Sequence, residues 1–556
     1  MGFPLPAEES FKTILDKFHL VNPDHGKSWQ VRFFNVTGSC DPARHYMIPA
    51  ERRLPGCEAL ITKGSYFVVH APRQTGKTTA MKALARRLTA EGRYAALRFS
   101  CQGAQVFPED VGAAEKAVWS EIEVSARSDL PEALRPPARV AADPGGFLRI
   151  QLARWAEACP RPLALIFDEI DAIGGPSLRS ILSQLRSGFD DRPAAFPWSV
   201  ILCGMRDVRD YKAASGGDPQ RLGTSSPFNI KEKSLLIANF TEAEMRELYA
   251  QHTAETGQVF TEKALERAFA LTQGQPWLCN ALAREVVEEI AVPPAEPITA
   301  AHVDDAKERL ILARATHLDS LLARLREKPV RRILGPVLAG TLRKNPSFDA
   351  DFEYVTDLGL VAPRPPPRIA NPIYQEVILR VLASPVEGMI DADPKSYVRA
   401  SGRFDLRRLL RDFADFWREH SDVLIGTVDY REVAPQLVLM AYLHRLVNGG
   451  GFIGREVGVG RKRIDLVVRW PYKNRRGKRA VQREALELKV WRDRDKKGDP
   501  LAAGLVQLDA YLATLGLSRG VLVIFDARAG AAPVEERTRF EEAVTASGRI
   551  VTVLRA

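Results

Sequence analysis

The stretch SYFVVHAPRQTGKTT spans residues 65–79 and combines three patterns that together decide the fold of this part of the chain. It begins with a short apolar run, continues through a loop, and ends where an amphipathic helix starts at Thr79. A GxxxxGK[ST] loop between a strand and a helix points its backbone N–H groups at phosphates, and the helix dipole adds positive potential. Residues 71–78 follow this Walker A spacing, with Ala71 in place of the first glycine. We therefore predict a nucleotide phosphate site here.

The side chains of this loop predict ATP and Mg²⁺ as cofactors. In loops of this kind the lysine bridges the β- and γ-phosphates, and the hydroxyl that follows holds Mg²⁺. Lys77 and Thr78 occupy those two positions. The residues expected to bind the nucleotide are Pro72, Arg73, Gln74, Thr75, Gly76, Lys77, Thr78 and Thr79.

A second apolar run, residues 163–167, ends in two carboxylates, Asp168 and Glu169. In ATP hydrolysis, Asp168 would accept a Mg²⁺-bound water and Glu169 would orient the attacking water. The alternative is an acidic pair that caps a following helix. The next apolar run ends close to Arg206, which either senses the γ-phosphate or lies on the surface. Thr78 and Asp168 are the metal ligands expected at this site.

Apolar runs alternate with amphipathic helical stretches from residue 64 to 235, which is typical of a buried parallel sheet in an α/β fold. From 241 to 310 the pattern is helical, and Thr241 followed by two glutamates predicts an N-cap. Residues 313–383 hold short helices and then a stretch typical of a helix, a turn and a wing.

The composition predicts a soluble globular chain of several domains. It has 556 residues, of which 45% are hydrophobic and 27% charged, so disordered and fibrous classes are excluded. No apolar run approaches the roughly 18 residues that cross a bilayer, no secretory signal is visible, and no membrane partner is expected. Six cysteines without a CxxC pair predict neither disulfides nor a zinc site, and the cytoplasm is the expected compartment.

The formal net charge of +10 is concentrated in residues 455–500, which carry 16 Lys and Arg against seven Asp and Glu. Such a block is either a solvated loop or a surface that follows a polyanion. Nucleic acid, with DNA favoured, is the expected partner. The residues expected to contact it are Lys473, Arg475, Arg476, Lys478 and Arg479.

The same basic segment contains carboxylates in a pattern that suits Mg²⁺-dependent cleavage of phosphodiester bonds. Asp465 precedes one apolar run, and Glu487 and Lys489 lie two residues apart on the next, so the latter two share a strand face. Two carboxylates can hold Mg²⁺, and a lysine can orient water or stabilise the developing negative charge. The alternative for Glu-x-Lys is the solvated face of an edge strand. Gln507 and Tyr511 share one face of the helix expected over 501–515.

Several separate motifs in residues 30–385 resemble AAA-like ATPases of the STAND type. They are DEID (168–171), GMRDVRDYK (204–212), SSPFNIKEKSL (225–235), GQPWL (274–278) and NPIY (371–374). The resemblance implies a helical lid and a winged helix after the ATPase core. It also implies that Pro276 packs on the adenine side of the nucleotide and that HYMIP (45–49) lies near the base. The winged helix would hold the nucleotide domain closed or bind DNA, and we favour the first role.

The C-terminal region resembles the PD-(D/E)xK nuclease superfamily, which has an α-β-β-β-α-β core. The resemblance implies that Asp465, Glu487 and Lys489 are catalytic, with Asp465 and Glu487 as metal ligands. QLDAY (507–511) is similar to the QxxxY signature of one exonuclease branch, so Gln507 and Tyr511 would steady the site or the nucleic-acid backbone. Glu432 is either a third acid or a helix dipole partner. Ile464 departs from the proline of the superfamily motif.

These inferences predict an α/β fold class: a P-loop parallel sheet with a helical lid and a winged helix, plus a separate restriction-endonuclease-like α/β domain. The expected parts are an N-terminal segment near the base (1–50), the P-loop ATPase core (51–235), the lid (236–312), the winged helix (313–385), a linker (386–425) and the nuclease-like domain (426–556).

The predicted function is an ATPase coupled to a Mg²⁺-dependent nuclease, an architecture that by analogy suggests genome defence or mobile-element biology. The main alternative is a STAND-type switch ATPase whose C-terminal domain binds nucleic acid without cutting it. A scaffold with degenerate sites is a third reading, for which Ala71 is the hint. Assembly into a homo-oligomer is left open.

Overall fold

The computed structural model divides the chain into two compact units, Met1–Ala313 and Arg314–Ala556. Each unit is described by itself. The structure describes residues 32–205, 230–313, 323–338, 342, 346, 349–362, 365–387, 394–427, 434–447, 452–454, 466–473, 477–493 and 498–556.

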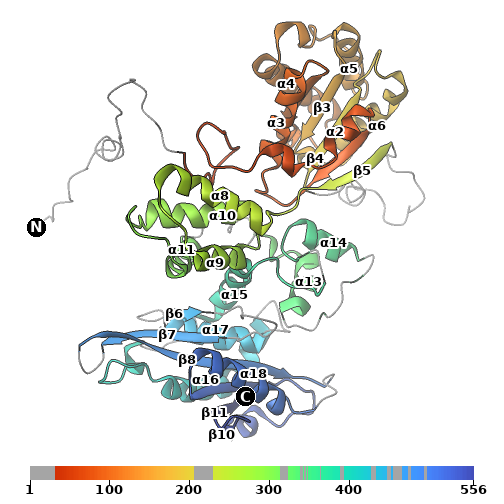
Figure 1. Cartoon of the computed structure of the whole chain (residues 1–556). Coiled ribbons are helices and arrows are strands. Elements are labelled where there is room, and N and C mark those ends of the chain that lie inside the picture. The colour runs from red at the N-terminus through yellow and green to blue at the C-terminus, as the bar shows by residue number, and fades with distance from the viewer. Residues whose placement is uncertain are drawn as a thin grey trace, which may run out of the picture. The chain divides into compact units, whose positions relative to one another are not determined.

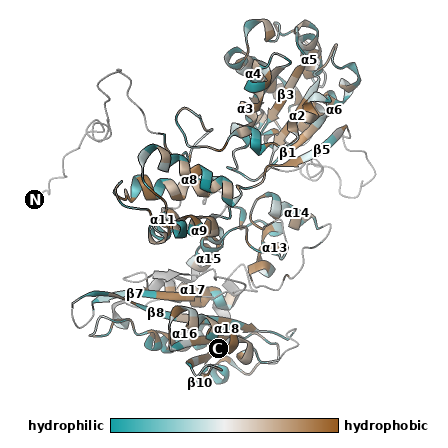
Figure 2. Ribbon diagram, in the orientation of Figure 1, coloured by the Kyte–Doolittle hydropathy of each residue, from teal (hydrophilic) through white to brown (hydrophobic). Residues whose placement is uncertain are grey.

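The first unit is built on a five-stranded parallel sheet with the order β2-β3-β4-β1-β5 (Figure 1). Its strands are β1 (Tyr66–His70), β2 (Ala95–Ser100), β3 (Leu163–Asp168), β4 (Ser199–Gly204) and β5 (Lys231–Leu236). The apolar runs that predicted β1 to β4 are buried, and Figure 2 shows these strands as a hydrophobic interior. The edge strand β5 was not predicted by such a run, and its Leu236 is 50% exposed. Because the strands are parallel, their carboxyl ends meet at one edge of the sheet.

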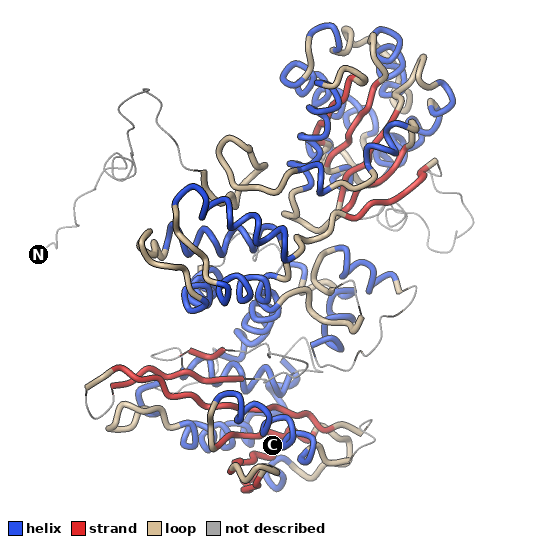
Figure 3. Tube along the Cα trace, in the orientation of Figure 1, coloured by secondary structure: helices blue, strands red, loops and turns tan. Residues whose placement is uncertain are grey.

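Helices cover both faces of this sheet (Figure 3). One face packs against α2 (Cys57–Thr62) and α3 (Lys77–Ala90). The other packs against α4 (Val111–Asp129), α5 (Phe147–Ala158) and α6 (Gly175–Ser187). The 3-10 helices of this unit are η1 (Ala50–Arg53), η2 (Gln102–Ala104), η3 (Glu132–Leu134), η4 (Ile170–Ala172) and η5 (Phe189–Asp191).

A helical region follows the sheet, as the sequence predicted. It consists of α8 (Glu242–Thr256), α9 (Glu262–Thr272), α10 (Pro276–Arg284), a π-helical turn η7 (Glu285–Glu289) and α11 (Ala300–Leu312). The predicted N-cap is confirmed, because Thr241 and Glu244 form a capping box at the start of α8.

The second unit contains a six-stranded mixed sheet with the order β10-β11-β9-β8-β7-β6. Its strands are β6 (Phe452–Gly454), β7 (Leu466–Lys473), β8 (Arg479–Trp491), β9 (Arg519–Asp526), β10 (Arg539–Val544) and β11 (Ile550–Arg555). Its helices are α13 (Lys328–Leu338), α14 (Ala350–Asp357), α15 (Pro372–Glu387), η8 (Pro394–Tyr397), α16 (Leu406–Thr427), α17 (Ala434–Val447), α18 (Leu501–Leu515) and α19 (Val534–Arg537).

The helix α18 packs closely on one face of this sheet. A Cβ added at Gly504 would lie 2.7 Å from Leu522 of β9, so the missing side chain lets the helix approach the strand. On the opposite face, Phe413 and Trp417 of α16 contact Phe525. The sheet therefore lies between helices on both sides.

The described elements confirm the α/β class and the parallel P-loop sheet. In the second unit, α17, β6, β7, β8, α18 and β9 follow the predicted order of helix, three strands, helix and strand. Their identity as a nuclease core stays a prediction, as does that of the winged helix, where an antiparallel bridge joins Val361 to Ile369 after α14.

Two parts of the prediction for the second unit need correction. The range 386–425, expected to be a linker, contains most of α16, whose Leu409, Phe413 and Trp417 form a buried stripe at a spacing of four residues. The strands β10 and β11 follow β9 and extend the sheet beyond the α-β-β-β-α-β core that the resemblance implied. Among the described residues, no helix is both long and apolar enough to span a membrane.

In the helical region of the first unit, the backbone at Gly274 lies close to the backbone at Phe240. Gly274 has φ +72, and a Cβ there would lie 1.9 Å from the carbonyl oxygen of Phe240. Gly274→Ala should lower the free energy of unfolding by more than the about 1–2 kcal/mol that a left-handed conformation alone costs. Gly257→Ala is the matched control, since Gly257 has φ +77 with nothing within 4 Å. Urea denaturation compares the two, and equal losses would contradict the steric argument.

Candidate functional site

In the loop between β1 and α3, the Lys77 side chain folds back onto backbone carbonyl groups of the same loop. The Lys77 ammonium donates to the carbonyl oxygens of Ala71 at 2.6 Å and Pro72 at 2.7 Å. The Thr75 hydroxyl donates to the Pro72 carbonyl at 2.9 Å and closes the loop further. Burial lowers the pKa of Lys77, because desolvation disfavours its charged form.

The replacement of the first Walker A glycine by Ala71 is compatible with this loop. Positive φ values in the loop occur at Gln74, with φ 56, and at Gly76, with φ 85, and not at Ala71. The Ala71 side chain is fully buried in the core beneath α3. A methyl group is therefore accommodated at position 71, and this departure gives no support to a degenerate site.

Asp168 lies at the end of β3 as predicted and receives donors from two other elements. The Thr78 hydroxyl donates to Asp168 Oδ2 at 2.9 Å. Arg98 of β2 donates to the same oxygen through Nε at 2.8 Å and Nη2 at 2.6 Å. Asp168 is 1% exposed, so the guanidinium balances a buried negative charge.

Arg98 was missed by the sequence analysis. It lies in an otherwise apolar run, and its partner is 70 residues away. The pairing follows from the register of the two strands, in which Ser100 is opposite Asp168. No local pattern indicates that register.

Glu169 follows Asp168 in a strained backbone conformation, with φ 59. Ser100 donates its hydroxyl proton to Glu169 Oε2 at 2.5 Å and so orients the carboxylate. The Glu169 amide donates to Asp168 Oδ1 at 3.1 Å. Arg206, the other side chain predicted at this sheet edge, lies outside the described residues.

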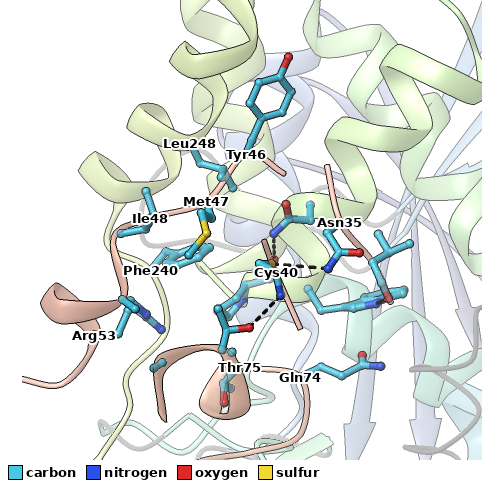
Figure 4. Close-up of a pocket in the computed structure, with 18 of the residues that line it drawn as sticks. Asn35, Cys40, Tyr46, Met47, Ile48, Arg53, Gln74, Thr75, Phe240 and Leu248 are labelled. Atoms are coloured by element: carbon cyan, nitrogen blue, oxygen red, sulfur yellow. Dashed lines mark hydrogen bonds between the residues drawn. The ribbon is translucent and has the colours of Figure 1, made fainter. Parts of the chain in front are cut away.

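A pocket of about 130 Å³ opens beside the loop (Figure 4). It is lined by predicted nucleotide-binding residues, by most of the HYMIP segment, and by the start of α10. The predicted nucleotide-binding residues in the lining are Gln74, Thr75, Gly76 and Thr79. The HYMIP segment contributes Tyr46, Met47 and Ile48, and α10 contributes Pro276. The resemblance had implied that Pro276 and HYMIP lie near one nucleotide base, and the structure brings them to one pocket.

The pocket also contains residues that the sequence analysis did not single out for binding. They are Asn35, Val36, Gly38, Cys40, Ala50, Arg53, Ala80, Phe240, Leu248, Trp277 and Asn280. Trp277 belongs to the GQPWL motif, so the sequence did contain a signal for its place in the pocket. The residues from 35 to 40 lie in an irregular segment without periodic pattern.

Hydrogen bonds join the three walls of this pocket. The Cys40 amide donates to the Thr79 hydroxyl of α3 at 3.0 Å, and the Trp277 indole donates to the Val36 carbonyl at 2.8 Å. Gln251 of α8 donates to the Met47 carbonyl at 3.0 Å. The N-terminal segment therefore bridges the sheet domain and the helical region.

In the second unit, Glu487 and Lys489 lie together on β8 as predicted. Lys489 Nζ donates to Glu487 Oε1 at 2.6 Å, and Glu487 is 1% exposed. Ala485 of the same strand face packs under Leu508 and Leu512, so this is the face that α18 covers.

The remaining predicted residues of this unit divide into three groups. Tyr511 of α18 is buried against Val467 of β7, and Gln507 is half-buried. Lys473, Lys478 and Arg479 are exposed at the far end of β7 and β8. Asp465, Arg475, Arg476 and Glu432 lie outside the described residues.

The residues at the first site fit a nucleotide with Mg²⁺. Thr78 and Asp168 present two hard oxygen atoms at hydrogen-bond distance, which suits Mg²⁺, and Lys77 is close to the N-terminus of α3. At the second site the fit is partial, because no three His, Cys, Asp or Glu side chains converge within the described part of the chain.

A match to a known protein family covers the residues of the first site. Residues 61–211 match a family model described as AAA domain. No curated protein matches the chain. Among solved structures, the Walker-type ATPase PABY2304 of Pyrococcus abyssi is similar with a TM-score of 0.44 and 14% identity, over 62% of this chain and 99% of that one.

Two further solved structures are more distant. The Thermotoga maritima RuvB Holliday junction branch migration motor has a TM-score of 0.33 and 16% identity, over 59% of this chain and 93% of its own. The Aeropyrum pernix ORC2 protein has a TM-score of 0.32 and 14% identity, over 60% and 93% of the two chains. The match over residues 61–211 and the loop geometry identify this part of the chain as a P-loop ATPase domain of the AAA type.

Proposed function

We propose that this protein couples ATP hydrolysis in its first unit to Mg²⁺-dependent cleavage of nucleic acid by its second. The observation that carries the first half is the contact between Thr78 and Asp168, which joins the loop after β1 to the carboxyl end of β3. The observation that supports the second half is the buried Glu487 carboxylate paired with Lys489.

In the ATPase half, Thr78 and Asp168 would hold Mg²⁺, which neutralises phosphate charge during hydrolysis. Lys77 would exchange its two carbonyl partners for oxygens of the β- and γ-phosphates, and the loop amides would bind the same group. Glu169, oriented by Ser100, would polarise the attacking water. The adenine base would occupy the pocket lined by Met47 and Pro276.

In the nuclease half, Glu487 would supply a carboxylate to Mg²⁺, which lowers the pKa of a bound water. Lys489 would release Glu487 and stabilise the negative charge that develops on the scissile phosphate. Asp465, the second proposed ligand, lies outside the described residues. Gln507 and Tyr511 would support the site from α18.

The alternative function is a nucleotide-controlled switch whose second unit binds nucleic acid without cutting it. The observation that favours this alternative is that, among the described residues, no three His, Cys, Asp or Glu side chains converge around Glu487 to hold a metal ion. In both functions the helical region 236–312 would act as a lid and 313–385 as a winged helix. In both, the P-loop unit could also assemble into a homo-oligomer.

Lys77→Ala should weaken ATP binding by at least about 30-fold, since removing a buried charged partner of a phosphate costs about 2 kcal/mol or more. Lys63→Ala is the matched control, because Lys63 is exposed at the end of α2 and absent from the pocket lining. Fluorescence titration with a labelled ATP analogue measures both. Parent-like affinity in Lys77→Ala would overturn the nucleotide assignment.

Arg98→Met should destabilise the first unit by about 3 kcal/mol, because it leaves the Asp168 carboxylate buried without its guanidinium partner. Adding Asp168→Asn removes that charge, so the double variant should lose less stability than the two single losses combined. Urea denaturation without nucleotide or Mg²⁺ gives this double-mutant cycle. Strictly additive losses would show that the ion pair is not energetically coupled.

Glu487→Gln and Lys489→Ala should each reduce the rate of Mg²⁺-dependent degradation of plasmid and linear DNA by at least about 100-fold. Glu535→Gln serves as a control for Glu487→Gln, since Glu535 is exposed on α19. Gel electrophoresis with and without ATP follows cleavage. Equal cleavage by the parent and Lys489→Ala would exclude the nuclease, and binding without cleavage by the parent would favour the switch.

A further inference from the structure

The strands β7 and β8 form a two-stranded ribbon with two different faces. They pair in antiparallel register, and three successive cross-strand pairs share one face: Arg469 with Arg483, Pro471 with Val481, and Lys473 with Arg479. We call this set of six residues the basic ribbon face. It places four cations on two opposite pairs.

The other face of the ribbon is occupied by the chain itself. Trp470 is stacked on Phe404 at 4.9 Å between ring centroids, and its indole donates to the Gly402 carbonyl at 3.0 Å. Gln482 bonds both the amide and the carbonyl of Phe404, at 3.0 and 2.9 Å. The turn before α16 therefore anchors this face as structure.

Most of the basic ribbon face is open to solvent, whereas Arg469 is half-buried. Val481 is 56% exposed, and Lys473, Arg479 and Arg483 are also exposed. None of these three cations forms an ion pair with an acidic side chain of the described chain. Lys473 and Arg479 lie directly opposite each other with both side chains exposed, and like charges so placed across an antiparallel ladder destabilise a sheet. Folding stability therefore does not account for this arrangement, whereas an anionic partner does.

The ribbon extends beyond its neighbouring strands, as Figure 1 shows for β7 and β8. The strand β9 pairs with β8 only over Leu486–Trp491, and β6 pairs with β7 only up to Arg469. Lys473 lies four positions after Arg469 on β7, a distance of about 13 Å along the strand. A ribbon of two strands fits the major groove of B-form DNA, about 12 Å wide, while the deep, narrow groove of an RNA duplex excludes it.

We propose that the basic ribbon face binds double-stranded DNA, with the ribbon lying in the major groove and its cations contacting the flanking phosphates. This inference rests on the proposed function, because Glu487 and Lys489 continue the same side of β8 from Arg479, Val481 and Arg483. A duplex bound to this face would extend along β8, so that its phosphodiester backbone approaches Glu487 and Lys489.

The test compares two triple variants of the full chain in EDTA, where no cleavage occurs. Lys473→Gln/Arg479→Gln/Arg483→Gln removes three cations of the basic ribbon face. Lys328→Gln/Arg411→Gln/Arg519→Gln removes three exposed cations elsewhere in the same unit and is the matched control. Fluorescence anisotropy with a labelled 20-base-pair DNA duplex gives the Kd as a function of salt concentration.

The ribbon variant should bind at least about 30-fold more weakly than the parent at 0.1 M salt, and its slope of log K against log salt should be shallower by about 3. The control should change that slope by less than about 1. Because the ribbon variant loses like-charged neighbours, its Tm should equal or exceed that of the parent. Single-stranded DNA and duplex RNA should compete less effectively than duplex DNA.

Equal slopes for the two triple variants, or equal competition by single strands, would overturn the proposal. The outcome is separable from that of the nuclease assignment, which is read from cleavage in Mg²⁺. Salt-dependent duplex binding that the ribbon variant loses would support the ribbon even if the parent cuts nothing. Cleavage by the parent with unchanged binding by the ribbon variant would retain the nuclease and reject the ribbon.

Discussion

The ATPase domain depends on one buried carboxylate oxygen, Oδ2 of Asp168, which accepts hydrogen bonds from residues 90 and 70 positions earlier in the sequence. Thr78 reaches it from the start of α3, and Arg98 reaches it from β2. A carboxylate that is 1% exposed would be costly without such donors. The same oxygen that stabilises the junction of these elements is the proposed metal ligand. An arriving cation must therefore compete with the guanidinium of Arg98 or share the carboxylate with it.

The loop and the carboxylate could be predicted because each has a local signal. The Lys77–Thr78 pair follows an apolar strand and opens a helix, and Asp168 ends the next apolar run. Arg98 could not be predicted, because its role arises from the alignment of β2 with β3 and not from its neighbours in sequence. The N-terminal segment was expected near the base, but Asn35 and Cys40 were not singled out within it, because an irregular segment carries no periodic pattern.

In the second unit, a helical pattern was present in the range that was predicted to be a linker. The stripe of Leu409, Phe413 and Trp417 has helical spacing, yet the Pro- and charge-rich residues before it led to a linker assignment. The strand β10 was missed because its sequence, RFEEAV, is largely exposed and lacks a buried apolar run. Glu487 and Lys489 were placed on one face correctly, because alternation along a strand needs only the sequence. Their relation to Asp465 depends on β7 register beyond the described residues.

The two units use positive charge in opposite ways. In the ATPase domain two cations at the site are paired internally, Arg98 with Asp168 and Lys77 with loop carbonyls, so their charge is satisfied within the fold. On β7 and β8, cations face one another across the ladder, with Val481 exposed between them. Internal pairing suits a site that must be preorganised for one small ligand. Charge placed at some cost to the sheet suits a surface completed by a large polyanion, because binding converts repulsion into counterion release. The exposed cations Lys473, Arg479 and Arg483 therefore lie where they do not help the sheet to fold, which is the placement expected for the proposed binding surface.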